Sequence, residues 1–148
     1  MPEIEIRPLR PGDEPDWRRL WTGYLEFYQT SVPEEVYVSS FARLLSKDPQ
    51  EFHGRIALVD GTPLGIVHFL FHRHMWKIEN ACYLQDLYVA PEARGTGLGR
   101  ALIEHVYGEA DAAGAPAVWW LTQDFNHEAR RLYDRIGVKT PFIRYNRA

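Results

Sequence analysis

The stretch from Gln85 to Val106 reads QDLYVAPEARGTGLGRALIEHV, and it decides the fold class. Its first part belongs to an apolar run, 84–89, that is typical of a buried strand, and residues 97–113 carry an apolar stripe at helical spacing. Glycines between them let backbone N–H groups converge on an anion, while the helix N-terminus and Arg94 supply positive charge. The stretch therefore predicts a strand, a phosphate- or pyrophosphate-binding loop and a helix.

Two better-known glycine loops do not match this segment. A P-loop needs Lys followed by Ser or Thr after its last glycine, whereas Arg100 follows Gly99 here. A Rossmann fingerprint places its third glycine one position later and lies near the first strand of its domain, whereas this loop lies in mid-chain. The simplest alternative is a turn whose glycines only permit a tight backbone.

Alternation of period two and helical stripes predict the other elements, which Pro, Gly, Asp and Asn separate. The predicted strands cover 3–8, 53–59, 64–74, 81–89, 117–122 and 142–145, and the predicted helices cover 11–28, 31–48, 97–113 and 126–137, with Ser31 and Asn126 as N-caps. This order indicates a three-layer α/β sandwich, in which a central mixed, mostly antiparallel sheet has helices on both faces. We expect one domain, 1–148.

The composition excludes several classes of protein. A chain of 148 residues, 45% hydrophobic and 14% aromatic, suits one compact domain and argues against disorder. A net charge of −3 gives no basic face for nucleic acid. No apolar run reaches the roughly 18 residues of a membrane helix, and the charged N-terminus is unlike a signal peptide. The lone Cys82 suits a reducing compartment, so we expect a cytoplasmic protein without a membrane or nucleic-acid partner.

The glycine loop resembles that of a known family. The sequence RGTGLG at Arg94–Gly99 is similar to the R/Q-x-x-G-x-G/A loop with which the GNAT superfamily of N-acetyltransferases binds the pyrophosphate of acetyl-CoA. A second motif of that family, N-x-x-A-x-x-L-Y-x-x-x-G, is matched in order by Asn126, Ala129, Leu132, Tyr133 and Gly137. The resemblance implies the acyl-CoA N-acyltransferase fold, acetyl-CoA as co-substrate and direct acetyl transfer to a primary amine.

A looser resemblance concerns the acceptor. Residues 72–76, 82–89 and 139–142 are similar to the subgroup around the yeast histone-and-polyamine-type acetyltransferases. We expect a small cationic acceptor, such as a polyamine, a diamine or an amino acid. A lysine or N-terminal amine of a protein, a catalytically silent CoA-binding sensor and an unrelated nucleotide-phosphate binder are the alternatives. The resemblance also implies a homodimer, formed through the C-terminal strand 142–145.

The family implies cofactor contacts on three segments. The strand before the loop holds the pantetheine arm and the thioester through its main chain, the loop holds the pyrophosphate, and the short helix after it lies beside the cofactor. The implied acetyl-CoA-binding residues are Leu87, Tyr88, Val89, Arg94, Gly95, Thr96, Gly97, Leu98, Gly99, Arg100, Asn126, Ala129 and Tyr133. For the side chains of residues 87–89, ordinary core packing is the better interpretation.

Acetyl transfer needs a neutral amine. An alkylamine with a pKa of about 10.4 costs about 4.6 kcal/mol to deprotonate at neutral pH, so a base or desolvation must contribute. Polyamine acetylases of the family carry a Glu-Asp pair on the strand before the loop, where this chain has Gln85 and Asp86. Gln85 cannot accept a proton. Asp86 is therefore the candidate base, with Glu79 or a histidine-linked water in reserve; alternatively, Asp86 only binds the ammonium group.

Tyr133 corresponds to the family's general acid, and a phenol with a pKa of about 10 is well matched to an alkyl thiolate. Tyr133 also lies on the apolar stripe of its predicted helix, so core packing is the alternative. A route through an acetylated Cys82 is the weaker option, since nothing in the sequence activates that thiol.

Alternation predicts that His68, His72 and His74 share one strand face. No further ligand completes a zinc site, so we expect no metal and interpret the face as part of the acceptor cleft. Aromatic and acidic groups suit a cationic acceptor, although Trp17 and Trp21 are better read as core. The candidate acceptor-binding residues are Tyr24, Tyr28, His72, Gln85 and Asp86.

Overall fold

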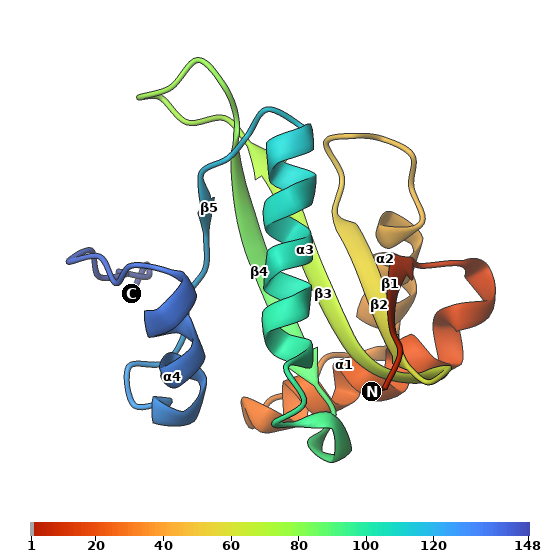
Figure 1. Cartoon of the computed structure of the whole chain (residues 1–148). Helices are drawn as coiled ribbons and strands as arrows, with labels where there is room; N and C mark the ends of the chain where they lie inside the picture. Colours follow the sequence, from red (N-terminus) through yellow and green to blue (C-terminus); the bar gives the residue numbers. More distant parts are fainter. Residues whose placement is uncertain (1) are drawn as a thin grey trace.

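A five-stranded sheet runs through the middle of the molecule, with its strands in sequence order (Figure 1). The computed structural model describes residues 2–148. The strands are β1 (Ile4–Pro8), β2 (His53–Val59), β3 (Thr62–His72), β4 (Ala81–Val89) and β5 (Val118–Trp119). The α-helices are α1 (Glu14–Phe27), α2 (Glu34–Leu44), α3 (Leu98–Ala112) and α4 (His127–Ile136), and the 3-10 turns are η1 (Pro11–Asp13) and η2 (Pro91–Ala93).

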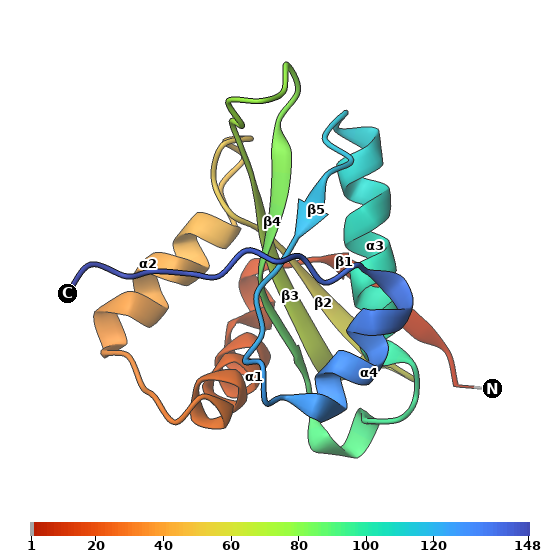
Figure 2. The ribbon, with the colours of Figure 1, turned by 90° about the vertical axis from the view of Figure 1, so that its left-hand side faces the viewer.

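The helices cover both faces of this sheet, as the sequence predicts. Figure 2 shows α1 and α2 on one side and α3 and α4 on the other. The α3 face buries Leu98, Leu102 and Val106 against β3 and β4, and the opposite face buries Trp17, Leu20 and Phe41 against β2 and β3. These buried residues occupy the helical stripes of the sequence. The result is a three-layer α/β sandwich.

All strand pairs are antiparallel except β4 with β5. The parallel pair is short, because it matches only Cys82 with Val118 and Tyr83 with Trp119. Beyond these two pairs the chain after β5 leaves β4, and the two segments separate toward α4 (Figure 1). This divergence exposes the middle of β4 on its outer side and positions the candidate site.

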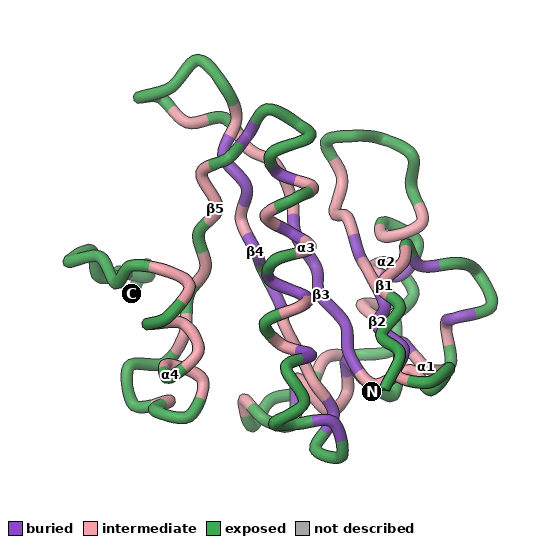
Figure 3. The backbone as a smooth tube through the Cα atoms, in the orientation of Figure 1, coloured by how far each residue is buried: buried purple, intermediate pink, exposed green. Residues whose placement is uncertain are grey.

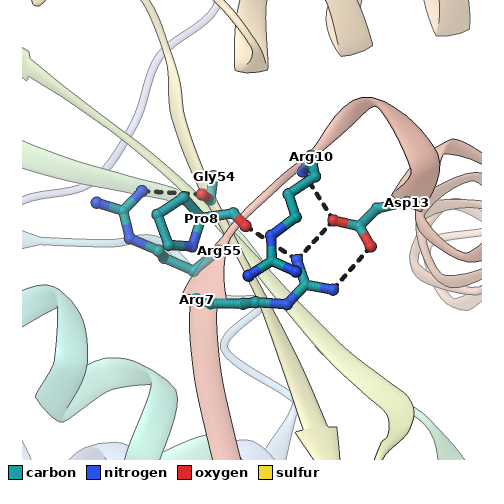
Figure 4. Close-up of polar contacts among 6 residues, drawn as sticks. All are labelled: Arg7, Pro8, Arg10, Asp13, Gly54 and Arg55. Carbon is teal, nitrogen blue, oxygen red and sulfur yellow. Dashed lines mark hydrogen bonds and ion pairs between the residues drawn. The ribbon is translucent and has the colours of Figure 1, made fainter.

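The β1–α1 junction is fixed by one buried carboxylate (Figure 4). Asp13 accepts two hydrogen bonds from the Arg7 guanidinium, at 2.7 and 2.9 Å, and one from the backbone N–H of Arg10 at 2.7 Å. Both side chains are mostly buried. The hydrogen bond from Arg7 is the main cause of a lowered pKa for Asp13, so the pair stays ionised. The edge strand is thereby tied to the first helix.

Several predicted boundaries are wrong. No strand forms at 142–145, where Phe142 is 78% and Ile143 77% exposed, and Figure 3 shows the C-terminal segment exposed. A strand needs a neighbour to satisfy its backbone, and β5 is only two residues long. Ser31 does not cap α2, which begins after Pro33 without a side-chain cap. Among residues 2–148, no helix is long and apolar enough to cross a membrane.

Candidate active site

The glycine loop has the geometry of an anion-binding turn. After η2, residues 94–97 form turns, with φ of +81° at Gly95 and +86° at Gly97. This left-handed conformation is costly for residues with a Cβ atom. Gly97 is also the N-cap of α3, so the first N–H groups of the helix have no intrahelical partner and face the loop.

Arg94 and Arg100 differ in whether the guanidinium group already has an ion-pair partner. Arg94 is exposed, and its Nε donates to the carbonyl of Val89 at 3.2 Å, which leaves both Nη groups for a ligand. Arg100 is ion-paired with Glu104 through Nε at 2.7 Å on the exposed side of α3. Thr96 directs its hydroxyl back to the carbonyl of Ala93. Arg94 is therefore the cation that best fits a phosphate at this loop.

A β-bulge in β4 precedes the loop. Phe69 pairs with Leu84, but the next residue on β3, His68, pairs with Asp86, so Gln85 is the extra residue. The bulge shifts the alternation of β4, and Leu84 and Leu87 both pack on the α3 side. Gln85 is left exposed, whereas Asp86 is buried. The sequence alone did not reveal this bulge.

A pocket lies where β4 and the segment after β5 diverge. It brings together Gln85 of β4, Tyr133 of α4 and the two tyrosines at the end of α1, Tyr24 and Tyr28. Apolar and aromatic side chains complete its lining, namely Leu84, Leu87, Ile103, Trp120 and Leu121. The sequence analysis missed Leu84, Ile103, Trp120 and Leu121 because their apolar runs read as core. Five predicted site residues, Tyr24, Tyr28, Gln85, Leu87 and Tyr133, thus share one pocket.

The tyrosines of this pocket keep their protons at neutral pH. Burial raises the pKa of Tyr133 to about 12, with a smaller contribution from Tyr28. Burial and then the negative charge of Asp86 raise the pKa values of Tyr24 and Tyr28. Each phenol is therefore available as a hydrogen-bond donor or as an acid.

Asp86 lies behind the pocket tyrosines, on the α1 side of the sheet. It is 9% exposed, and Nδ1 of His68 lies 2.8 Å from its Oδ2. The carboxylate is close enough to affect Tyr24 and Tyr28 by its charge. A buried carboxylate bordered by phenols suits an ammonium group or a transferable proton.

The three histidines do not form one site. His68 bonds to Asp86, whereas Nε2 of His72 accepts from the indole of Trp119 at 2.9 Å, outside the pocket lining. His74 lies beyond the end of β3, and its Nδ1 accepts from the backbone of Trp76. The predicted shared face is wrong for His74, because β3 ends at His72, whereas His68 and His72 both lie on the face opposite Val67, Phe69 and Phe71. Over residues 2–148, no group of three metal-binding side chains is found.

Asn126 and Cys82 have clear structural roles. The Asn126 side chain caps α4 by accepting from the N–H of Ala129 at 3.3 Å. Cys82 is fully buried, and burial raises the pKa of its thiol to about 11. A thiol with that pKa is a poor nucleophile at neutral pH, which argues against an acetylated cysteine.

Comparison with known proteins agrees with this geometry. The profile of the acetyltransferase (GNAT) family matches residues 16–138. A D-amino-acid N-acetyltransferase of Saccharomyces cerevisiae, HPA3, is 40% identical over 147 residues, covering 97% of this chain and 90% of that protein. An aminoalkylphosphonate N-acetyltransferase of Salmonella typhimurium is 30% identical over 152 residues, covering 100% and 93%. The structure of AAC(6')-Iy with a CoA bisubstrate analogue has a TM-score of 0.85 at 18% identity, covering 99% and 98%.

Proposed function

The chain belongs to the acetyltransferase (GNAT) family and is an N-acetyltransferase, and from this premise we propose that it acetylates the amine of a small, amino-acid-like acceptor with acetyl-CoA. The pocket that joins Gln85 and the tyrosines of α1 to Tyr133 is the observation that carries the proposal. Polyamines and diamines are the other acceptors in the same class.

The glycine loop is the proposed pyrophosphate site. Its left-handed Gly95 and Gly97 leave open space where a Cβ atom would stand, and the free N–H groups of α3 and the exposed Arg94 offer complementary charge. The main chain of Leu87, Tyr88 and Val89 would hold the pantetheine arm, and Asn126 and Ala129 would border it. Acetyl-CoA supplies the activated thioester.

Direct transfer breaks the C–S bond and forms a C–N bond, so the site must take one proton from the amine and give one to the sulfur. We assign the first task to Asp86, the buried carboxylate nearest the pocket tyrosines. Tyr133 has the second task, because its raised pKa keeps a proton on the phenol for a leaving thiolate. Gln85, Tyr24 and Tyr28 would hold the amine between them.

Two observations favour an acceptor with an acidic group. The acceptors named for the yeast and Salmonella relatives, a D-amino acid and an aminoalkylphosphonate, each combine an amine with an acid. In this chain Asp86 and Arg144 both act on Tyr83: burial raises its pKa, the charge of Arg144 opposes the rise, and Asp86 adds to it. The charges of a carboxylate and a guanidinium thus both reach Tyr83, and such a pair of charges would complement a zwitterion.

The test is thiol release from acetyl-CoA with a panel of amines. We expect D-amino acids and aminoalkylphosphonates to be acetylated with a higher kcat/KM than diamines, polyamines or a lysine-rich peptide. Preference for the peptide would favour the protein-amine alternative. Binding of acetyl-CoA without turnover of any amine would contradict the proposal and favour a silent sensor.

A further inference from the structure

Three buried side chains form one hydrogen-bonded chain behind the pocket. The indole N–H of Trp17 in α1 donates to Nε2 of His68 in β3 over 2.9 Å, and Nδ1 of His68 lies 2.8 Å from Oδ2 of Asp86 in β4. The exposed fractions are 0% for Trp17, 4% for His68 and 9% for Asp86. His68 and Asp86 are direct partners in the β3–β4 register, so the backbone sets their contact.

The chain allows only one protonation form of His68. An indole nitrogen can only donate a hydrogen bond, so Nε2 of His68 must present its lone pair to Trp17. The ring proton then lies on Nδ1 and points to the Asp86 carboxylate. A doubly protonated ring would turn a second donor toward the indole, and the other neutral tautomer would turn a lone pair toward the carboxylate. The two hydrogen bonds therefore fit only the Nδ1–H tautomer of His68.

The His68 ring is also held sterically. Trp17 and Trp21 pack around it with ring centroids 6.1 and 6.2 Å away, and the two indoles stack on each other at 5.2 Å. On its other side, a Cβ atom at Gly54 would lie 3.6 Å from the ring. A ring enclosed in this way has little freedom to turn away from Asp86.

A neutral partner matters for the Asp86 carboxylate. A neutral His68 donates to one oxygen, Oδ2, without placing a positive charge beside the carboxylate. That charge acts on Tyr24 and Tyr28 at the pocket. An imidazolium in the same place would neutralise Asp86 and weaken its attraction for an ammonium group.

We propose that His68, fixed as the Nδ1–H tautomer by Trp17, is a positioning residue that orients the Asp86 carboxylate toward the amine without neutralising it. This inference rests on the proposed function, because it assigns the base of that reaction a partner. His68 itself does not touch the pocket.

Two substitutions separate the two hydrogen bonds. In His68→Asn the amide nitrogen can occupy the place of Nδ1 and donate to Asp86, but the side chain is too short to accept from Trp17. In His68→Gln the side chain reaches the place of Nε2 and can accept from Trp17, but it leaves Asp86 without its donor. The two variants are polar and uncharged, so each serves as the control for the other.

We expect the two variants to differ in activity although both lose one buried hydrogen bond. Loss of a hydrogen bond to the charged Asp86 should lower kcat of His68→Gln about 10- to 100-fold, with a smaller loss in His68→Asn and little change in KM for acetyl-CoA in either. Both variants should melt below the native protein, because His68→Asn leaves the buried Trp17 N–H unsatisfied and His68→Gln leaves Asp86 without its donor. Equal kcat values in the two variants, or activity that simply follows melting temperature, would overturn the inference.

A spectroscopic measurement tests the tautomer independently of activity. Proton–nitrogen correlation spectra of the ¹⁵N-histidine-labelled native protein should show the His68 proton on Nδ1 and an unprotonated Nε2 at neutral pH. A proton on Nε2 would overturn the inference. An Nδ1–H ring in a protein that acetylates no amine would instead contradict the proposed function, so the two failures are distinguishable.

Discussion

Tyr133 is the residue whose chemistry is most directly testable. Burial raises its pKa to about 12, so it stays protonated across the neutral and mildly alkaline range. Replacing it by phenylalanine removes the proton and keeps the ring, so Tyr133→Phe should lower kcat about 100-fold and leave KM for acetyl-CoA nearly unchanged. Steady-state thiol release measures both constants.

The matched control is Tyr145→Phe, since Tyr145 is 87% exposed and outside the pocket lining. It should behave as the native protein does. Because the pKa of Tyr133 is raised, kcat of the native protein should show no loss from its ionisation below about pH 11. Unchanged kcat in Tyr133→Phe would remove this residue from the mechanism.

The assignment of Asp86 as the base predicts a pH-dependent loss of activity when it is replaced. Without a base, the reaction has only the small fraction of free amine, so Asp86→Asn should lower kcat/KM about 100-fold at neutral pH. The deficit should shrink as rising pH deprotonates the acceptor in solution. Glu79→Gln is the control, because Glu79 is the alternative candidate for the base and is exposed in the β3–β4 connection. Full activity of Asp86→Asn with loss in Glu79→Gln would reverse the assignment.

At the residue scale, the family resemblance predicted Tyr133 and Gln85, and the aromatic residues of the first helix predicted Tyr24 and Tyr28. The structure brings all four into one pocket. Strand alternation did not predict the surroundings of the three histidines. Alternation assigns His68, His72 and His74 the same environment. Their hydrogen-bond partners differ, because those partners depend on where β3 ends and on how it is paired with β4. The bulge that places Asp86 opposite His68 is such a register feature, and no local pattern signals it.

At the scale of elements, a substitution in the loop before α3 tests the proposed phosphate site. Gly97 has a φ of +86°, so Gly97→Val would strain the turn and place a branched side chain where the N–H groups face. Affinity for acetyl-CoA, measured by calorimetry, should fall at least about tenfold. Gly108→Ala is the control: within α3 it meets nothing, so it should stabilise the fold by about 0.8 kcal/mol and leave binding intact. Native affinity in Gly97→Val would place the pyrophosphate elsewhere.

The β1–α1 junction makes a prediction about stability. Asp13→Asn breaks a largely buried ion pair and should lower the free energy of unfolding by about 3 kcal/mol at neutral pH. The folded state lowers the pKa of Asp13, so this contribution is complete above the unfolded pKa of about 3.9 and disappears as pH falls through the folded value. Urea unfolding at pH 7 and at pH 3 measures the difference.

The control for that experiment is Asp16→Asn, whose exposed pair with Arg19 spans 3.6 Å and should matter little. A constant difference between native protein and Asp13→Asn from pH 7 to pH 3 would contradict an ionic role. Equal effects of the two substitutions would show that burial at Asp13 adds nothing.

Long periodic segments were predictable, and short edge segments were not. β2, β4 and α3 agree with the sequence to within a residue, because their apolar stripes or alternation extend over several turns or pairs. β5 is only Val118–Trp119 although its apolar run is longer, and 142–145 is no strand. Their pairing depends on a neighbouring edge, which local sequence does not encode.

At the scale of the whole molecule, the C-terminal segment 142–145 exposes apolar side chains. Phe142 and Ile143 are 78% and 77% exposed, and exposed apolar side chains next to each other are typical of an interface. We predict a homodimer through this segment, as the family resemblance implies. Sedimentation velocity should show Ile143→Asp as a monomer and Ile78→Asp, in the exposed hairpin tip, as a dimer. A monomeric native protein at micromolar concentration would contradict the prediction.

The central claim is acetyl transfer from acetyl-CoA to an amino-acid-like amine at the pocket lined by Tyr133, with Asp86 behind it as the base. The most direct measurement is mass spectrometry of a D-amino acid after incubation with the native protein and acetyl-CoA carrying a ¹³C-labelled acetyl group. We predict the labelled N-acetyl amino acid from the native protein and from Tyr145→Phe, and far less from Tyr133→Phe. Equal product from the native protein and Tyr133→Phe, or none above the protein-free background, would contradict the account.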